Sequence, residues 1–181
     1  MVEVNELLGR RTLIVGEAGS GKTKLLSEIV ETLRNMGYGG EVTVIDLAPP
    51  KMGRVGGSLD EYIDVGGLNY LKPSLVYAPR RQACNPDDLL RYVNHNLQQA
   101  RGLFRRYLEK PTRILAVNDL TIHLQGGEVD EVKEIINKAE TFIATAYKGE
   151  ALQEDYGTGV TKAEREKLGE VTKLMHRIIQ L

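Results

Sequence analysis

Residues 16–23 read Gly16-Glu17-Ala18-Gly19-Ser20-Gly21-Lys22-Thr23 and match the pattern G-x-x-x-x-G-K-[ST] at every fixed position. Glycine lets the main chain turn tightly, so that successive backbone N–H groups can surround a polyphosphate. In this pattern the lysine reaches the β- and γ-phosphates and the threonine hydroxyl binds Mg²⁺. The stretch therefore predicts a phosphate-binding loop, or P-loop. We expect the nucleotide to be bound by Gly16, Glu17, Ala18, Gly19, Ser20, Gly21, Lys22, Thr23 and Lys24.

The segments on either side of this loop are of the kinds that the motif requires. Before it, the run 11–15 is typical of a buried strand. After it, apolar residues recur at helical spacing, namely Leu25, Leu26, Ile29, Val30, Leu33 and Met36. The start of that helix adds partial positive charge beside the phosphates.

The rest of the chain alternates between strand patterns and helix patterns. We expect strands at 41–47, 74–78, 113–117 and 141–146, and helices at 86–108 and 128–138. A capping box of Thr161 and Glu164 predicts a last helix that continues through Ile179. Such alternation implies right-handed crossovers. The predicted fold is a three-layer α/β/α sandwich with a mainly parallel sheet of about five strands.

Size and composition favour one domain. A chain of 181 residues is expected to form a single domain over 1–181. Glycine-rich stretches at about 49–70 and 149–160 are predicted as mobile loops. The 24 basic and 25 acidic side chains create no overall field that would attract nucleic acid. Because we see no membrane-length apolar stretch and no signal peptide, we expect a cytoplasmic protein that binds no membrane.

A second motif bears on nucleotide turnover. The buried run 114–117 ends at Asn118-Asp119, as in a Walker B strand. In one register Asp119 holds Mg²⁺ through water; in the other Asn118 takes that place and Asp119 orients the attacking water. Both registers put Asp119 at the site, with Thr23 as the metal-binding hydroxyl. Both also leave the site one acid short, so we expect slow turnover, with Lys22 and Asp119 as the catalytic residues.

Polar residues after the neighbouring strands form a possible substrate site. Loops that follow parallel strands converge at one edge of the sheet. Asp46 could contact an acceptor hydroxyl there, and Arg80 and Arg81 could hold an anionic substrate. The alternative is that Asp46 ends a turn and the two arginines are solvated. The loop 51–58, with Lys51 and Arg54 among glycines, could close on phosphates or on a partner, and the alternative is a flexible surface loop with no such role.

Through residues 16–23 and 114–119 the chain resembles the P-loop NTPase superfamily, which implies a three-layer α/β sandwich that binds Mg-nucleotide. The stretch 118–121 also resembles the corrinoid adenosyltransferases, which place Asp-Glu-Leu there, although the P-loop of that family arranges its glycines and lysine differently. The GTPase motif Asn/Thr-Lys-x-Asp does not follow a strand here, so ATP is expected rather than GTP.

Three functions remain open from the sequence. The first is Mg²⁺-dependent ATP binding with slow hydrolysis. The second is a small-molecule kinase that uses Asp46 as the acceptor base. The third is a regulatory module that binds nucleotide without turnover and contacts a protein partner through its loops.

Overall fold

The computed structural model describes residues 2–53 and 57–181, and in this part of the chain six strands form one sheet. The strands are β1 (Arg11–Gly16), β2 (Val42–Asp46), β3 (Asn69–Leu71), β4 (Ile114–Asn118), β5 (Thr141–Tyr147) and β6 (Arg177–Gln180). All pairs are parallel, in the order β3-β2-β4-β5-β1-β6. The predicted α/β class with a parallel sheet is confirmed, but the sheet has six strands rather than about five.

The helices are α1 (Lys22–Leu33), α2 (Pro79–Gln82), α3 (Pro86–Glu109), α4 (Thr121–Leu124), α5 (Val129–Lys138) and α6 (Val160–Lys173). Short 3-10 or π turns lie at Val4–Leu7, Arg34–Tyr38, Gly39–Glu41 and Leu59–Glu61. The longest helix, α3, begins as its sequence predicts: Pro86 is its first residue and the Asp88 N–H donates to Asn85 Oδ1 at 2.8 Å.

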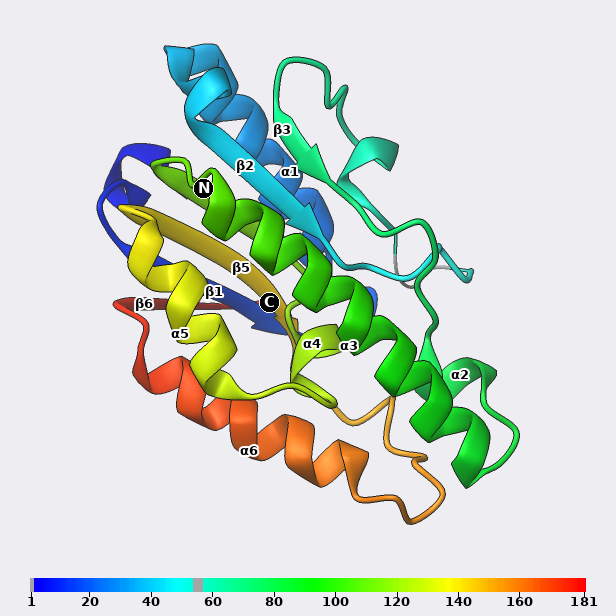
Figure 1. The fold of residues 1–181 in the computed structure, drawn as a ribbon. Coiled ribbons are helices and arrows are strands. Elements are labelled where there is room, and N and C mark those ends of the chain that lie inside the picture. The colour runs from blue at the N-terminus through cyan, green and yellow to red at the C-terminus, as the bar shows by residue number, and fades with distance from the viewer. Residues whose placement is uncertain (1, 54–56) are drawn as a thin grey trace.

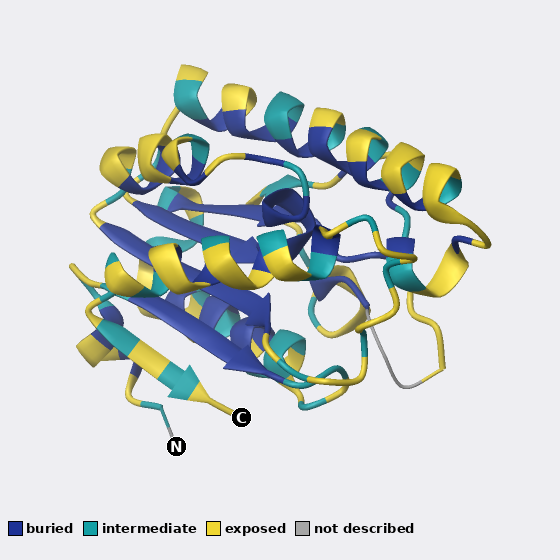
Figure 2. Cartoon of the chain, turned by 90° about the horizontal axis from the view of Figure 1, so that it is seen from below, coloured by how far each residue is buried: buried dark blue, intermediate teal, exposed yellow. Residues whose placement is uncertain are grey.

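Helices cover both faces of the sheet, so the three-layer arrangement is confirmed. Successive strand residues point to opposite faces: Leu13 and Val15 pack in a cluster with α3, α5 and α6, whereas Ile14 packs in a cluster with α1. In Figure 1, α3, α5 and α6 lie in front of the sheet and α1 lies behind it. Figure 2 shows the central strands buried between helices whose outer faces are exposed.

The prediction of a strand at 74–78 is wrong. Ser74–Ala78 has no strand structure, and the strand that pairs with β2 is β3, a few residues earlier. The reason is the side chain of Asn96 on α3. Its Oδ1 accepts from the Tyr77 N–H and its Nδ2 donates to the Tyr77 carbonyl oxygen, both at 2.9 Å. At Tyr77 the side-chain amide of Asn96 therefore makes the hydrogen bonds that a neighbouring strand would otherwise make.

The last predicted helix is too long, and its predicted capping box is wrong. α6 ends at Lys173, and Arg177–Gln180 becomes β6, which pairs with β1. The exposure in β6 alternates from residue to residue, as expected for a strand at the sheet edge. Gly159, not Thr161, occupies the N-cap of α6.

The strand order fixes the geometry of one edge of the sheet. β5 lies between β1 and β4, and β2 lies on the other side of β4. The carboxyl ends of these strands therefore bring the P-loop, the end of β4 and the end of β2 to the same edge. The segment after β2 is not wholly irregular, because it contains the turn Leu59–Glu61 and β3. Among the described residues, no helix combines the length and apolar character of a membrane span.

Candidate functional site

The P-loop connects β1 to α1 and is tightly turned. Gly21 precedes α1 with a φ of 95°, a left-handed conformation that only glycine adopts freely. At Gly16 a Cβ atom would lie 2.7 Å from Ser20 Oγ and 2.7 Å from the Leu181 carbonyl oxygen. The fixed glycines of the motif thus stand where a larger residue would be strained or would collide.

The ammonium group of Lys22 turns back into this loop. Its Nζ donates to the carbonyl oxygens of Glu17 at 2.7 Å and of Gly16 at 3.1 Å. Burial lowers the pKa of Lys22, and the nearby carboxylates of Asp119 and Glu17 oppose that shift. A cation beside a helix N-terminus is an arrangement suited to an anionic ligand.

Glu17 fastens the P-loop to a second loop. Its Oε1 accepts from the Ala18 N–H at 2.8 Å, and its Oε2 accepts from the N–H groups of Glu150 at 2.7 Å and Ala151 at 3.3 Å. The N–H of Ala18 is the main cause of the lowered pKa of Glu17. The position of the 149–151 segment is therefore coupled to that of the P-loop.

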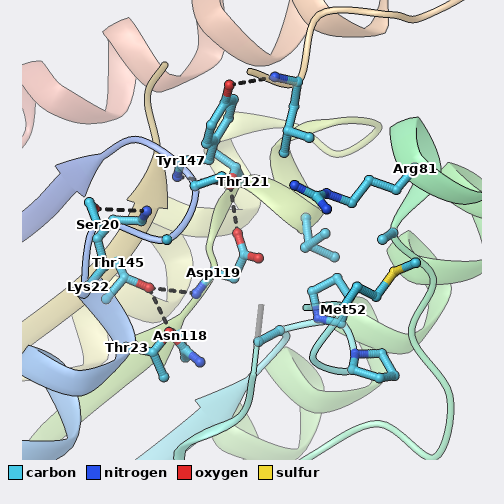
Figure 3. Close-up of a pocket in the computed structure, with 18 of the residues that line it drawn as sticks. Ser20, Lys22, Thr23, Met52, Arg81, Asn118, Asp119, Thr121, Thr145 and Tyr147 are labelled. Atoms are coloured by element: carbon cyan, nitrogen blue, oxygen red, sulfur yellow. Dashed lines mark hydrogen bonds between the residues drawn. The ribbon is translucent and has the colours of Figure 1, made fainter. Parts of the chain in front are cut away.

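Three polar side chains meet between the P-loop and the end of β4. Asn118 Oδ1 accepts from Thr145 Oγ1 at 2.8 Å and from Thr23 Oγ1 at 3.3 Å. Figure 3 shows the three residues around this point. The structure thus brings Thr23 to the end of the Walker B-like strand. No motif in the sequence marks Thr145, which is a buried polar residue of a mostly apolar strand.

Asp119 follows β4 in a strained backbone conformation. Its φ is 58°, in a region that residues other than glycine rarely occupy. The Asp119 N–H donates to Thr145 Oγ1, and its Oδ1 accepts from Thr121 Oγ1, both at 2.8 Å. Burial raises the pKa of Asp119, although Thr121, Lys22 and Arg80 oppose that rise. The carboxylate lines the same pocket as the P-loop.

Asp46 lies behind the pocket rather than in its wall. Its side chain is fully buried and accepts four hydrogen bonds. Asn118 Nδ2 at 2.9 Å and the Ala48 N–H at 3.3 Å donate to Oδ1, while Tyr70 Oη and the Leu59 N–H, both at 2.6 Å, donate to Oδ2. Burial raises the pKa of Asp46, and these donors oppose that rise because they stabilise the ionised form.

The two adjacent arginines differ in their surroundings. The side chain of Arg80 is 4% exposed, and its Nη2 donates to both carboxylate oxygens of Glu164 on α6, at 3.0 and 2.8 Å. Its guanidinium also lies 5.5 Å from the centre of the Tyr147 ring. Arg81 is exposed, lines the pocket and extends into it in Figure 3. The predicted capping role of Glu164 is thus wrong, and its pairing with Arg80 has no signal in the local sequence.

Most of the residues described above, though not Asp46 or Glu164, line one open pocket. Together with the open solvent at its mouth it encloses about 1000 Å³. Its floor is the loop 18–24, and its other walls include Pro49, Met52, Tyr62 and Leu152. Of the loop 51–58, residues 54–56 lie outside the described residues, and the predicted role of Arg54 lies there too.

The comparisons with known proteins report similarity in overall structure alone. No protein-family model matches the sequence, and no curated protein is similar to it. One similar solved structure is the Pif1 helicase from Candida albicans, at 17% identity and a TM-score of 0.39 over 96% of this chain. Another is an ATPase from the type III secretion system of pathogenic bacteria, at 12% identity and a TM-score of 0.48, also over 96%. This chain spans 36% and 51% of their respective lengths.

Proposed function

We propose that this protein binds ATP with Mg²⁺ in the pocket above the P-loop and hydrolyses it slowly. The observation that carries the proposal is a convergence: Lys22, Thr23, Asn118 and Asp119 all line one pocket at the carboxyl edge of a parallel sheet. In this proposal the P-loop N–H groups bind the phosphates, and Lys22 balances the charge that develops on them during transfer.

The oxygen atoms near Thr23 suit Mg²⁺. This ion prefers oxygen ligands and usually keeps several waters, with one or two protein groups and the phosphates completing its coordination. Thr23 Oγ1 and Asn118 Oδ1 are such oxygens, and they lie 3.3 Å apart. In our proposal these two groups hold Mg²⁺, directly or through water. The ion, when bound, neutralises phosphate charge.

The contact between Thr23 and Asn118 favours the second of the two Walker B registers. In that register Asn118 stands at the metal and Asp119 orients the attacking water. Asp119 Oδ1 is engaged by Thr121, and among the described residues no donor bonds Oδ2, which leaves this oxygen for a water molecule. Asp119 is the one carboxylate among the described residues that line the pocket, so we expect slow turnover.

The first test is nucleotide binding by the Lys22→Ala variant. Isothermal titration calorimetry and thermal shift with ATP, GTP, CTP and UTP, with Mg²⁺ and with EDTA, give the affinity and the preferred base. The matched control is Lys162→Ala, which removes an exposed lysine of α6 outside the pocket. ATP affinity should fall at least about tenfold in Lys22→Ala alone, because a charge-assisted contact is lost. Equal affinity in the wild type and Lys22→Ala would contradict the proposed site.

The second test separates binding from turnover. Asp119→Asn should bind ATP about as tightly as the wild type, but its phosphate release should fall by two orders of magnitude or more, because the amide cannot accept a proton from water. Unchanged phosphate release would remove Asp119 from the catalytic role. Absence of turnover in the wild type with every nucleotide would favour the regulatory module that binds without hydrolysis.

Arg81 supports a second candidate function, phosphoryl transfer to an anionic acceptor. Its guanidinium extends into the pocket, and among the described residues it makes no salt bridge. A kinase that uses Asp46 as the acceptor base is less well supported, because four donors already occupy Asp46 and it does not line the pocket. A metabolite screen with wild type and Arg81→Ala tests this candidate: an acceptor whose KM rises in Arg81→Ala supports it.

A further inference from the structure

We propose that Asp46 is a positioning residue that supplies, from β2, the negative charge for a Mg²⁺ ion held at Asn118 on β4. This inference rests on the proposed binding of Mg-nucleotide and deepens it. In a Walker B strand the charge belongs to the residue at the strand end. Here that residue is an amide, and the carboxylate lies one strand away, opposite it in the sheet register.

The hydrogen bonds form a continuous path from Asp46 to the expected metal position. Asp46 Oδ1 accepts from Asn118 Nδ2 at 2.9 Å, and Asn118 Oδ1 faces Thr23 Oγ1 at 3.3 Å. Because Nδ2 donates to a carboxylate, the amide is polarised and its Oδ1 becomes a better ligand for a cation. The same bond fixes which atom of the amide points to Thr23.

No cation neutralises Asp46 within the described part of the chain. Its four partners are two backbone N–H groups, the hydroxyl of Tyr70 and the amide of Asn118, all uncharged. A buried carboxylate normally has a charged partner or becomes protonated. The four donors fill all the acceptor positions of an ionised carboxylate, so the contacts favour the charged form. In its ionised form Asp46 therefore places an uncompensated negative charge next to Asn118.

The competing explanation is that Asp46 merely anchors the chain after β2. It bonds the Leu59 N–H at 2.6 Å, and Asn118 Nδ2 also lies 3.4 Å from the Gly57 carbonyl oxygen. A purely structural Asp46 would affect folding but not the preference of the site for metal-bound nucleotide. The ratio of ATP affinity in Mg²⁺ to ATP affinity in EDTA distinguishes the two explanations.

We would measure this ratio by calorimetry for three variants. Asp46→Asn removes the charge, and the ratio should fall about tenfold or more, because a divalent ion interacts strongly with a nearby buried charge. The double variant Asp46→Asn/Asn118→Asp exchanges the amide and the carboxylate, keeps the bond between the two side chains and should restore the ratio. Tyr70→Phe removes one donor to Asp46 without removing charge, and its ratio should match that of the wild type.

Two outcomes would overturn the inference. One is an unchanged ratio in Asp46→Asn. The other is a double variant that folds and binds ATP but whose ATP affinity is no higher in Mg²⁺ than in EDTA. This second test applies even if Asp46→Asn does not fold. Electron paramagnetic resonance of Mn²⁺, titrated into each variant with ATP, gives a second, non-catalytic measure of metal binding at this site. A wild type that binds ATP equally well with Mg²⁺ and with EDTA refutes this inference and the proposed Mg²⁺ site but leaves ATP binding standing, whereas a wild type that binds no nucleotide refutes the proposed function as a whole.

Discussion

Two carboxylates are buried beside the same pocket, and their partners differ. Glu164 on α6 is paired with the guanidinium of Arg80, and both side chains are almost completely buried. Asp46 at the end of β2 is buried to the same degree but has only uncharged partners among the described residues. The first carboxylate is neutralised inside the protein, and the second is not.

This difference indicates different roles. A buried ion pair with additional hydrogen bonds holds two elements together, and Gln125 Nε2 donates to Glu164 as well, at 2.9 Å. Arg80 and Glu164 therefore fix α2 against α6, and Arg80 forms part of the pocket wall. Asp46 has no charged partner among the described residues, and the neighbouring Asn118 faces Thr23, where we propose that Mg²⁺ binds and uses the charge of Asp46. The next experiments test this contrast.

The largest expected effect is on stability, in Arg80→Met. This change leaves Glu164 buried without its cation, which costs about 3–5 kcal/mol of unfolding free energy. Urea denaturation at neutral pH measures the loss. The control is the double variant Arg80→Met/Glu164→Leu, which removes both charges and should regain most of the stability. A loss below about 1 kcal/mol in Arg80→Met would mean that the pair is not a structural anchor.

Asp46→Asn should be less damaging than Arg80→Met. The asparagine keeps one of the two oxygens, so it can still accept from Tyr70 Oη and the Leu59 N–H. Its Nδ2 then faces two groups that are themselves donors, the Ala48 N–H and Asn118 Nδ2. We expect a loss of about 1–3 kcal/mol, the cost of unsatisfied buried hydrogen-bonding groups. The same urea experiment measures it. If Asp46→Asn lost more stability than Arg80→Met, the contrast between the two carboxylates would need to be reversed.

The sequence predicted the part of the site that depends on local pattern. The P-loop, Thr23 and the end of β4 follow from short motifs with fixed spacing, and the strand order then brings them together. The walls of the pocket depend on contacts between residues far apart in the chain. Arg80 and Glu164 are separated by 84 positions and Asp46 and Asn118 by 72, and no short pattern encodes either pair.

The same dependence on distant contacts explains the errors in the fold prediction. The stretch 74–78 has an apolar strand pattern, but the side chain of Asn96 takes its backbone groups out of the sheet. The apolar residues at 178–179 fit a continued helix as well as a strand, and only pairing with β1 selects the strand. Local patterns therefore fixed the type of most elements but not which backbone groups found a partner elsewhere.

A smaller effect is expected from Glu17→Gln, which tests the link between the P-loop and the 149–151 segment. Glutamine has one acceptor oxygen where Glu17 uses two, so the bonds to the N–H groups of Glu150 and Ala151 weaken. The overall stability should change by about 1 kcal/mol or less. Hydrogen exchange of these two amides should become faster. Unchanged exchange would mean that the segment is held by other contacts.

The smallest effect concerns Glu131, a partly exposed carboxylate that contrasts with the two buried ones. Burial opposes its ionisation, but hydrogen bonds from Arg101, the Glu128 N–H and His123 outweigh burial and lower the pKa of Glu131 to about 2. A carboxylate with a lowered pKa stabilises the fold above its ordinary pKa of 4.5, and this contribution is lost as the pH falls toward 2. Wild type should therefore lose more unfolding free energy than Glu131→Gln between pH 5 and about 2.5. Urea titrations across that range measure the difference, with the exposed Glu134 as the matched control in Glu134→Gln. Parallel curves for wild type and Glu131→Gln would show that the contacts of the Glu131 carboxylate contribute nothing to stability, as is the case for many ion pairs at protein surfaces.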